Sequence, residues 1–286
     1  MLTTAIHYAL GAMLLFGLGD LLYKRGAVAG AQPHHFLMVQ SWVFAPAVIL
    51  YGLFTGTLTF VAGTLWGAVA GLFMTVGFYN FAHSLKSGSI SINASVFRLS
   101  FVITAALAIV LLGEPLTANK LAGLALALAA VWLLLGAPAA GDAAGRRANR
   151  SALVRVLVAT AAVGIGTFIH KYGLRAGATP ASLVVAQAAM VVTLSTAFVF
   201  AADGRVRPSA AALRHAPRAA IVLALAFVFM LESLARGEAS VMAPIAQMGF
   251  VVTALLGFLF LREPFTARKG AGLVAALGAL ASLARG

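Results

Sequence analysis

The chain has 286 residues, of which 62% are hydrophobic and only 9% are charged, and its mean hydropathy is +1.01. Soluble domains carry charge on about a quarter of their residues, so this composition excludes a soluble globular protein. The absence of cysteine excludes disulfide bonds and thiolate metal sites. A net charge of +13 would by itself fit nucleic-acid binding, but its distribution along the chain does not.

Apolar runs long enough to cross a bilayer fill most of the chain. No Asp, Glu, Lys or Arg occurs from Gly26 to Leu85, or from Ala176 to Ala202. A membrane helix needs about 20 apolar residues, so the runs between Gly, Pro and charged clusters predict ten membrane helices. We expect the first helix to be retained, because no basic residue precedes it as in a signal peptide. The ten predicted helices span residues 4–25, 34–54, 61–83, 90–112, 118–136, 153–173, 181–202, 218–235, 240–261 and 266–284.

The chain contains an internal repeat. The segment from Glu114 to Leu124 returns 149 residues later as the segment from Glu263 to Leu273. The first predicted helices of the two halves also match, at an offset of 147 residues. We therefore expect one repeat at 1–136, an inter-repeat loop at 137–152 and a second repeat at 153–286.

Each repeat holds five predicted helices, and this odd number has a geometric consequence. The second copy must enter the membrane from the opposite side, so the predicted fold class is an all-α membrane protein with ten transmembrane helices in two inverted five-helix repeats. This is a common plan of secondary transporters, whose substrate sites lie near the midplane where the repeats meet.

Basic residues lie mainly in one set of loops. The odd-numbered loops hold 14 of the 20 Lys and Arg residues, the opposite face holds five, and Arg98 lies inside a helix. Short loops rich in Lys and Arg stay in the cytoplasm, so the sequence predicts external termini and a cytoplasmic inter-repeat loop. The charge therefore indicates membrane topology, and no nucleic-acid partner is expected.

Two motifs occur once in each repeat and suggest a family. A Gly-rich first helix reaches a lysine, from Gly17 to Lys24 and from Gly164 to Lys171, and a Glu-Pro turn lies between the fourth and fifth helices, at Glu114 and Glu263. This pattern resembles the EamA-type branch of the drug/metabolite transporter superfamily over nearly the whole chain. The resemblance implies ten helices around a central cavity and the movement of amino acids, drugs or other small metabolites. Many relatives are drawn with cytoplasmic termini, whereas the basic loops of this chain indicate the reverse.

Arg98 is the candidate for the centre of a substrate site. It lies about eight residues into the fourth predicted helix, roughly 12 Å deep at the helical rise of 1.5 Å per residue. Charges within membrane helices usually face a cavity, and the equivalent residue of the second repeat is Gln247. The alternative is that Arg98 pairs with Asp20 or Glu232 and holds helices together. The polar and aromatic residues expected to line the same space are Asn93, Asn80, Gln40, Gln187 and Tyr79.

Three titratable residues are candidates for proton coupling. Asp20 and Glu232 each lie four residues before a basic residue, Lys24 and Arg236, a spacing that favours an ion pair within one helix. His83 lies four residues after Tyr79, and histidine titrates near physiological pH. The alternatives are interfacial anchors for the two pairs and a structural hydrogen bond for His83.

The Glu-Pro turns are expected to be structural. Proline ends or kinks the preceding helix, so Glu114 and Glu263 should cap the following helices, five and ten. Phe16, Tyr79, Phe97 and Phe250 are candidates for aromatic walls, although 19 phenylalanines make ordinary packing the stronger explanation.

The predicted function is secondary transport. We expect an exporter of a small organic metabolite, such as an amino acid or a related zwitterion or anion, in a bacterial inner membrane, with protons as a possible coupling ion and a monomeric or homodimeric state. The alternatives are an uncoupled facilitator and a non-transporting membrane protein of lipid handling. No catalytic constellation, cofactor motif or metal-ligand spacing is found, so an enzyme is not expected.

Overall fold

The structure is a computed structural model that describes residues 2–87, 93, 96–134, 143–252, 255 and 266–285. All regular structure in these ranges is helical, and ten α-helices correspond in order to the ten predicted spans. The helices are α1 (Leu2–Val28), α2 (Pro33–Phe54), α3 (Leu65–Ser87), α5 (Ser100–Leu112), α6 (Ala118–Leu134), α7 (Ala143–Arg175), α8 (Pro180–Asp203), α9 (Ala210–Arg236), α10 (Ala239–Gln247) and α12 (Ala267–Leu283), with a short 3₁₀ helix, η1 (Ala62–Thr64), before α3.

Six of the helices in the described ranges are long and apolar enough to cross a membrane by length and composition. Three shorter apolar helices, Val96–Leu112, Ala118–Leu133 and Ala239–Val252, are also present. Large apolar side chains on the outer surface, such as Val110 and Leu121, are exposed as expected for contact with lipid. The predicted multi-pass, all-α membrane fold is confirmed.

Two helices, α7 and α9, begin several residues earlier than predicted. α9 begins at Ala210 instead of 218, because Ser209 caps it by accepting a 3.3 Å hydrogen bond from the backbone N–H of Ala212. Pro217 therefore lies inside the helix and does not start it. α7 begins at Ala143, within the predicted inter-repeat loop at 137–152, where alanine and arginine favour helix.

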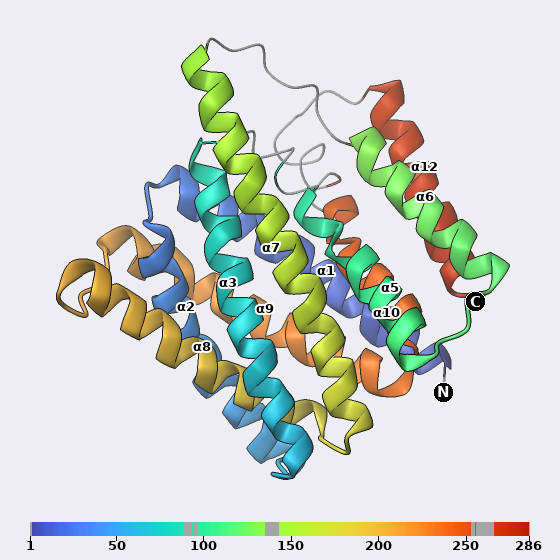
Figure 1. The fold of residues 1–286 in the computed structure, drawn as a ribbon, viewed down its shortest axis with the longest axis horizontal. Coiled ribbons are helices and arrows are strands. Elements are labelled where there is room, and N and C mark those ends of the chain that lie inside the picture. Colours follow the sequence, from blue (N-terminus) through green and yellow to red (C-terminus); the bar gives the residue numbers. More distant parts are fainter. Residues whose placement is uncertain are drawn as a thin grey trace.

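The two repeats are interleaved. The first helix of each repeat packs against the third helix of the other, so that α1 lies on α9 and α7 lies on α3. The second helices, α2 and α8, pack against each other. α1 and α7 cross the molecule in opposite directions, as inverted repeats require (Figure 1).

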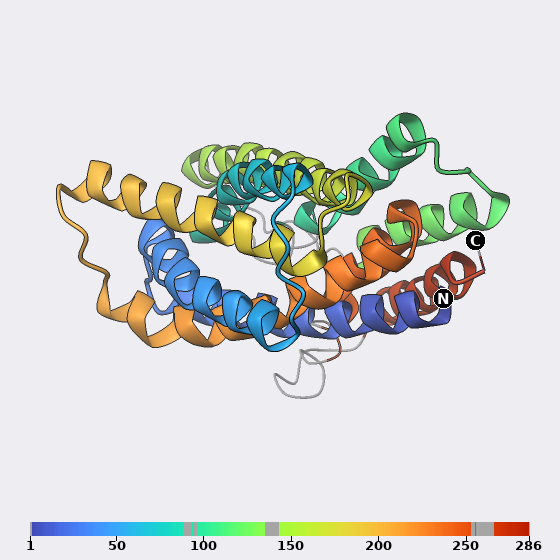
Figure 2. The same cartoon turned by 90° about the horizontal axis from the view of Figure 1, so that it is seen from below.

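The fifth helices of the repeats form a separate pair. α6 and α12 lie side by side at the end of the molecule where the C-terminus is found (Figures 1 and 2). The hydroxyl of Ser282 donates to the backbone oxygen of Asn119 over 2.9 Å at one end of the pair, and Arg268 donates to the backbone oxygen of Trp132 over 2.9 Å at the other. The two helices therefore run antiparallel.

Small residues allow the helices of different repeats to approach closely. A methyl group placed on Gly67 of α3 would lie 2.4 Å from the backbone oxygen of Leu183 in α8. One on Gly71 would lie 2.7 Å from the backbone oxygen of Gln187. Since membrane helices associate mainly through close packing, these glycines hold the repeats together.

Candidate functional site

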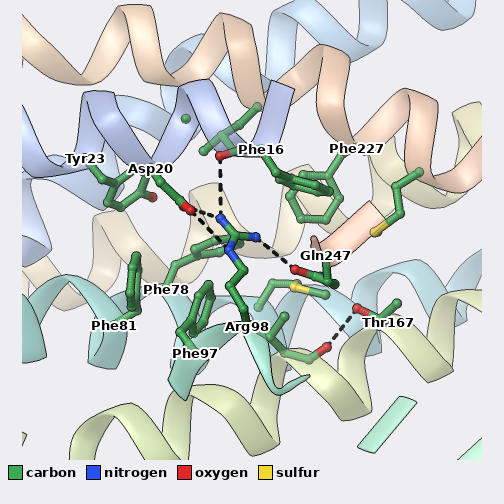
Figure 3. Close-up of a pocket in the computed structure, with 15 residues that line it drawn as sticks. Phe16, Asp20, Tyr23, Phe78, Phe81, Phe97, Arg98, Thr167, Phe227 and Gln247 are labelled. Carbon is green, nitrogen blue, oxygen red and sulfur yellow. Dashed lines mark hydrogen bonds and ion pairs between the residues drawn. The ribbon is translucent and has the colours of Figure 1, made fainter. Parts of the chain in front are cut away.

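A narrow cavity lies between the two repeats, near the middle of the helices (Figure 3). Both repeats contribute to it, through their first, third and fourth helices. Its walls are mostly aromatic and aliphatic, and one face carries a group of polar side chains. The lining residues are Phe16, Gly19, Asp20 and Tyr23 of α1, Met74, Phe78 and Phe81 of α3, Phe97 and Arg98, Val163 and Thr167 of α7, Leu223, Phe227 and Met230 of α9, and Gln247 of α10.

Arg98 is the centre of the polar face. Only 3% of the residue is exposed, and its guanidinium lies between Asp20 and Gln247 (Figure 3). Nε donates to Oδ2 of Asp20 over 3.1 Å, Nη2 forms an ion pair with Oδ1 of Asp20, and Nη1 donates to Oε1 of Gln247 over 2.9 Å. This two-pronged contact with a carboxylate is the geometry that arginine favours.

Aromatic rings surround the same guanidinium. Its central carbon lies 5.6 Å from the ring centres of both Phe16 and Phe97, within the range of a cation–π interaction. Phe97 stacks on Phe81 with 4.0 Å between ring centres, and Phe16 meets Phe227 edge to face at 5.6 Å. The cavity therefore combines a positive charge, a negative charge, an amide and a set of aromatic faces.

The polar face is asymmetric in charge although equivalent positions of the two repeats contribute to it. Gln247 occupies the position of Arg98 in the second repeat, 149 residues later, and Thr167 occupies the position of Asp20, 147 residues later. The first repeat therefore supplies a charged pair, and the second supplies its neutral equivalent. The third helices instead contribute the same apolar residue from each repeat. Phe78 in α3 and Phe227 in α9 are also 149 residues apart, and both line the cavity.

Both fourth helices are interrupted next to the polar face. In the segment Val96–Leu112 the backbone N–H of Leu99 donates to the oxygen of Val96 over 3.0 Å, and that of Met248 donates to Ile245 over 3.2 Å. These are hydrogen bonds of a tighter 3₁₀ turn, which often marks a hinge within a helix. Leu99 and Met248 follow Arg98 and Gln247 directly, so the hinges lie at equivalent positions in the two repeats.

The cavity is almost closed in this conformation. The space open to the centre of a water molecule is only about 20 Å³, enough for one or two waters. The cavity therefore has too little room for an organic ligand in this conformation.

Comparison with known proteins identifies the architecture. The EamA-like transporter family matches the chain twice, at residues 3–136 and 150–285. The chain belongs to the EamA-like transporter family. A solved crystal structure is similar over 98% of this chain and 96% of its own, with a TM-score of 0.79 and 17% sequence identity, which supports the fold alone. The comparison with curated proteins found no match.

Three other predicted binding residues are buried in the EamA-family fold. Gln40 is buried in α2 and accepts a hydrogen bond from the hydroxyl of Tyr23, which itself lines the cavity. Asn93 is buried and donates to the backbone oxygen of Ser84 over 2.8 Å. Gln187 is buried in α8, where its backbone lies against Gly71.

Three residues predicted as cavity lining lie elsewhere. The ring of Tyr79 meets Phe198 of α8 at 5.0 Å between centres, and Phe250 belongs to a core cluster around Phe101. Asn80 accepts a 3.2 Å hydrogen bond from Arg155 of α7 at a partly buried position. Phe16 and Phe97 do line the cavity, and the aromatic wall continues through Phe78 and Phe227.

The structure corrects one predicted ion pair and confirms another. Asp20 pairs with Arg98 of another helix, which is one of the alternatives given for Arg98, and not with Lys24 of its own. Glu232 does pair with Arg236 four residues later, and it also accepts a 2.8 Å hydrogen bond from Tyr51 of α2. Of the three coupling candidates, Asp20 therefore lies in the cavity, Glu232 lies between α2 and α9, and His83 lies beside Tyr79.

The Glu-Pro turn also acts differently from the prediction. The carboxylate of Glu114 is buried and accepts hydrogen bonds from the backbone N–H groups of Ala239, over 2.9 Å, and Ser240, over 2.8 Å. It therefore caps the N-terminus of α10, in the other repeat, and not the following helix α6. Glu263, its repeat equivalent, lies outside the described residues. The sequence could not identify this target, because the partners are more than a hundred residues away.

Lysines complete a charged cluster on this side of the molecule. Nζ of Lys171 donates to the backbone oxygens of Leu234 and Gly237, each over 2.7 Å, at the C-terminal end of α9. Lys120 is fully buried and pairs with Glu238. The α9–α10 turn is thus tied to both repeats.

Proposed function

We propose that this EamA-family transporter carries a small zwitterionic metabolite, such as an amino acid, and that Arg98, Asp20 and Gln247 bind its charged groups. The observation that supports this is the ion pair of Arg98 and Asp20 on the wall of a cavity shared by inverted repeats. A zwitterion carries one charge of each sign and can replace each partner of the pair with its own group.

The energetics favour exchange of partners within the cavity. A buried guanidinium without an anion costs several kcal/mol, so Arg98 needs a carboxylate at every stage of a cycle. In the closed, empty cavity Asp20 supplies it. With substrate bound, the substrate carboxylate contacts Arg98 and Gln247, and the substrate ammonium contacts Asp20 and the face of Phe16. A simple anion would leave Asp20 unpaired, and a simple cation would leave Arg98 unpaired.

The mechanism proposed is alternating access with rocking of one repeat against the other. The turns at Leu99 and Met248 lie next to the polar face and offer equivalent hinges in the two repeats. The cluster of Glu114, Lys171 and Glu238 must loosen when its side opens. We propose that the protein lies in a bacterial inner membrane and moves its substrate outward.

An uncoupled facilitator is the second candidate. The observation that favours it is that Asp20 is already neutralised by Arg98, so the empty protein can change conformation without binding a proton.

Transport by purified protein in liposomes tests the substrate class. The panel of labelled compounds contains a neutral amino acid, a monocarboxylate, a cationic amino acid and an aromatic cation. We expect saturable counterflow with the neutral amino acid. The double variant Asp20→Asn with Arg98→Gln, which keeps the cavity neutral, is the matched control and should show no counterflow. Preferred flux of the monocarboxylate or of a cation would contradict the zwitterion, and absence of flux for every member would contradict amino-acid transport.

A further inference from the structure

A second cluster of chemically active side chains lies where α2 begins and α8 ends. α2 starts with Pro33, whose fixed backbone suits the first helical turn, so His34 and His35 fall in that turn. α8 ends at Asp203, followed by Gly204 in the left-handed conformation with φ of 69°. α2 and α8 pack against each other, and this brings the two histidines and the aspartate together across 168 residues of sequence.

The two imidazole rings converge on one carboxylate oxygen. Nε2 of His35 lies 2.6 Å from Oδ2 of Asp203, and Nε2 of His34 lies 3.5 Å from the same atom. The three candidate ligand atoms all lie within 4.8 Å of one another. His35 is buried, whereas the side chain of Asp203 is 31% exposed.

This donor set matches a divalent transition metal. Zn²⁺ is held by imidazole nitrogen and carboxylate oxygen at about 2.0–2.2 Å, often by three protein ligands with water in the fourth position. Small rotations of the three side chains bring the present separations to those of a tetrahedral site. The exposed side of Asp203 leaves room for the ion to enter and for the water ligand.

The electrostatics of the C-terminal end of α8 fit a bound cation. Metal binding requires the neutral form of each imidazole. The C-terminal carbonyl groups of α8 carry the partial negative charge that favours a cation next to Asp203. Arg205 and Arg207 follow Asp203, but both are exposed to solvent.

We propose that His34, His35 and Asp203 form a binding site for a Zn²⁺-like divalent cation that joins α2 of the first repeat to α8 of the second. The sequence offers no metal-ligand spacing here, because the carboxylate ligand comes from a distant helix. The bound ion links the two repeats at one end of the molecule and stabilises their contact there.

Metal binding by the purified full chain tests the site directly. The protein is prepared without a histidine tag, stripped with a chelator and titrated with ZnCl₂ against a chromophoric competitor. We expect one saturable Zn²⁺ per chain and an upward shift of the thermal unfolding midpoint on addition of Zn²⁺. His35→Gln and Asp203→Asn should each weaken the binding roughly tenfold or more and remove the thermal shift.

Two further variants separate metal ligation from a hydrogen bond. Asp203→Asn keeps an oxygen that can accept a hydrogen bond from histidine but ligates a metal ion poorly. Asp203→His provides a third imidazole and should restore Zn²⁺ binding. His83→Gln and His7→Gln remove histidines outside the cluster and should leave the binding unchanged. Absence of stoichiometric Zn²⁺ binding, or binding that persists in both His35→Gln and Asp203→Asn, would overturn the proposal and leave the cluster as a hydrogen-bonded contact between α2 and α8.

Discussion

Arg98 donates a 2.9 Å hydrogen bond to Gln247, the residue that holds its own position in the other repeat. The contact lies where equivalent helices of the two inverted repeats meet, next to a 3₁₀ turn in each of them. A pair of this kind joins the two halves through one side chain from each. Motion of one repeat against the other must therefore change the contacts of Arg98.

Loss of the guanidinium should weaken substrate binding. Arg98→Gln removes the charge-assisted hydrogen bonds to a substrate carboxylate, and such a loss typically costs about 2–5 kcal/mol, or roughly thirtyfold or more in affinity. Arg98→Lys keeps the charge but not the planar fork, so we expect only partial recovery. Calorimetric or fluorescence titration of the purified variants with substrate measures both effects.

The same variant leaves Asp20 buried without its partner, which can destabilise the fold by itself. The double variant Asp20→Asn with Arg98→Gln removes both charges and should unfold at a temperature closer to that of the parent protein while still failing to bind substrate. Normal binding in this double variant would assign the ion pair to structure alone.

Proton coupling, if present, should depend on Asp20 more than on Glu232. Asp20→Asn should abolish accumulation driven by a pH gradient. Exchange of substrate for substrate needs no net proton movement, so it should persist, but only at higher substrate concentration, because the variant also loses the proposed Asp20 contact with the substrate ammonium. Glu232→Gln serves as the matched control and should retain accumulation, since Glu232 lies between α2 and α9. Uptake into liposomes with and without an imposed pH gradient provides the measurement. The same pH dependence in the parent and in Asp20→Asn would favour the uncoupled facilitator.

Glu114 should keep its end of the molecule closed. Glu114→Gln removes a negative charge from the N-terminus of α10 and replaces one accepting oxygen with a donor, at a cost of about 1–2 kcal/mol. The turn around Ser240 should then open more often. Because the chain has no cysteine, Ser240→Cys can report opening through its rate of labelling by a membrane-impermeant maleimide.

We expect the labelling of Ser240→Cys to accelerate about fivefold to thirtyfold when Glu114→Gln is added, as the free-energy cost above implies. Thr57→Cys, at an exposed position in the turn between α2 and η1, is the control and should react at the same rate in both backgrounds. An unchanged rate at Ser240→Cys would show that Glu114 does not restrain opening.

Close packing of α3 on α8 should make Gly67 intolerant of a methyl group. Gly67→Ala places Cβ 2.4 Å from a backbone oxygen that cannot move independently of its helix, and overpacking of this kind costs about 1–3 kcal/mol. Gly278→Ala is the matched control in α12, where the added Cβ meets only a flexible Leu126 methyl at 3.3 Å. Thermal unfolding in detergent should show a clear loss of stability for Gly67→Ala and little change for Gly278→Ala.

The orientation in the membrane follows from the basic loops and can be measured separately. External termini predict that green fluorescent protein fused to the C-terminus will not fluoresce when the chain is expressed in a bacterial inner membrane, because that protein does not mature after export through the general secretory route. A fusion placed after the Arg150 region should fluoresce. Bright fluorescence at the C-terminus would reverse the proposed orientation.

The sequence determined the membrane class, the ten helices and the inverted repeat, because these depend on local composition and on similarity between two stretches of one chain. It also identified Arg98 and Gln247 as an equivalent pair, since the repeat alignment places them in register. The same repeat alignment could also have predicted the aromatic wall, because Phe78 and Phe227 are related by the same offset.

Only the tertiary structure decided which charges meet. Asp20 has a basic residue one helical turn away, yet it pairs with Arg98, 78 residues later, because both side chains line the same cavity between the repeats. Glu114 caps a helix of the other repeat, and Asp203 reaches the histidines of α2. In each case the partner is set by how the repeats interleave. The strength of a buried charge interaction depends on the distance between the two charges and on their burial. Neither quantity can be read from the spacing of residues along the sequence.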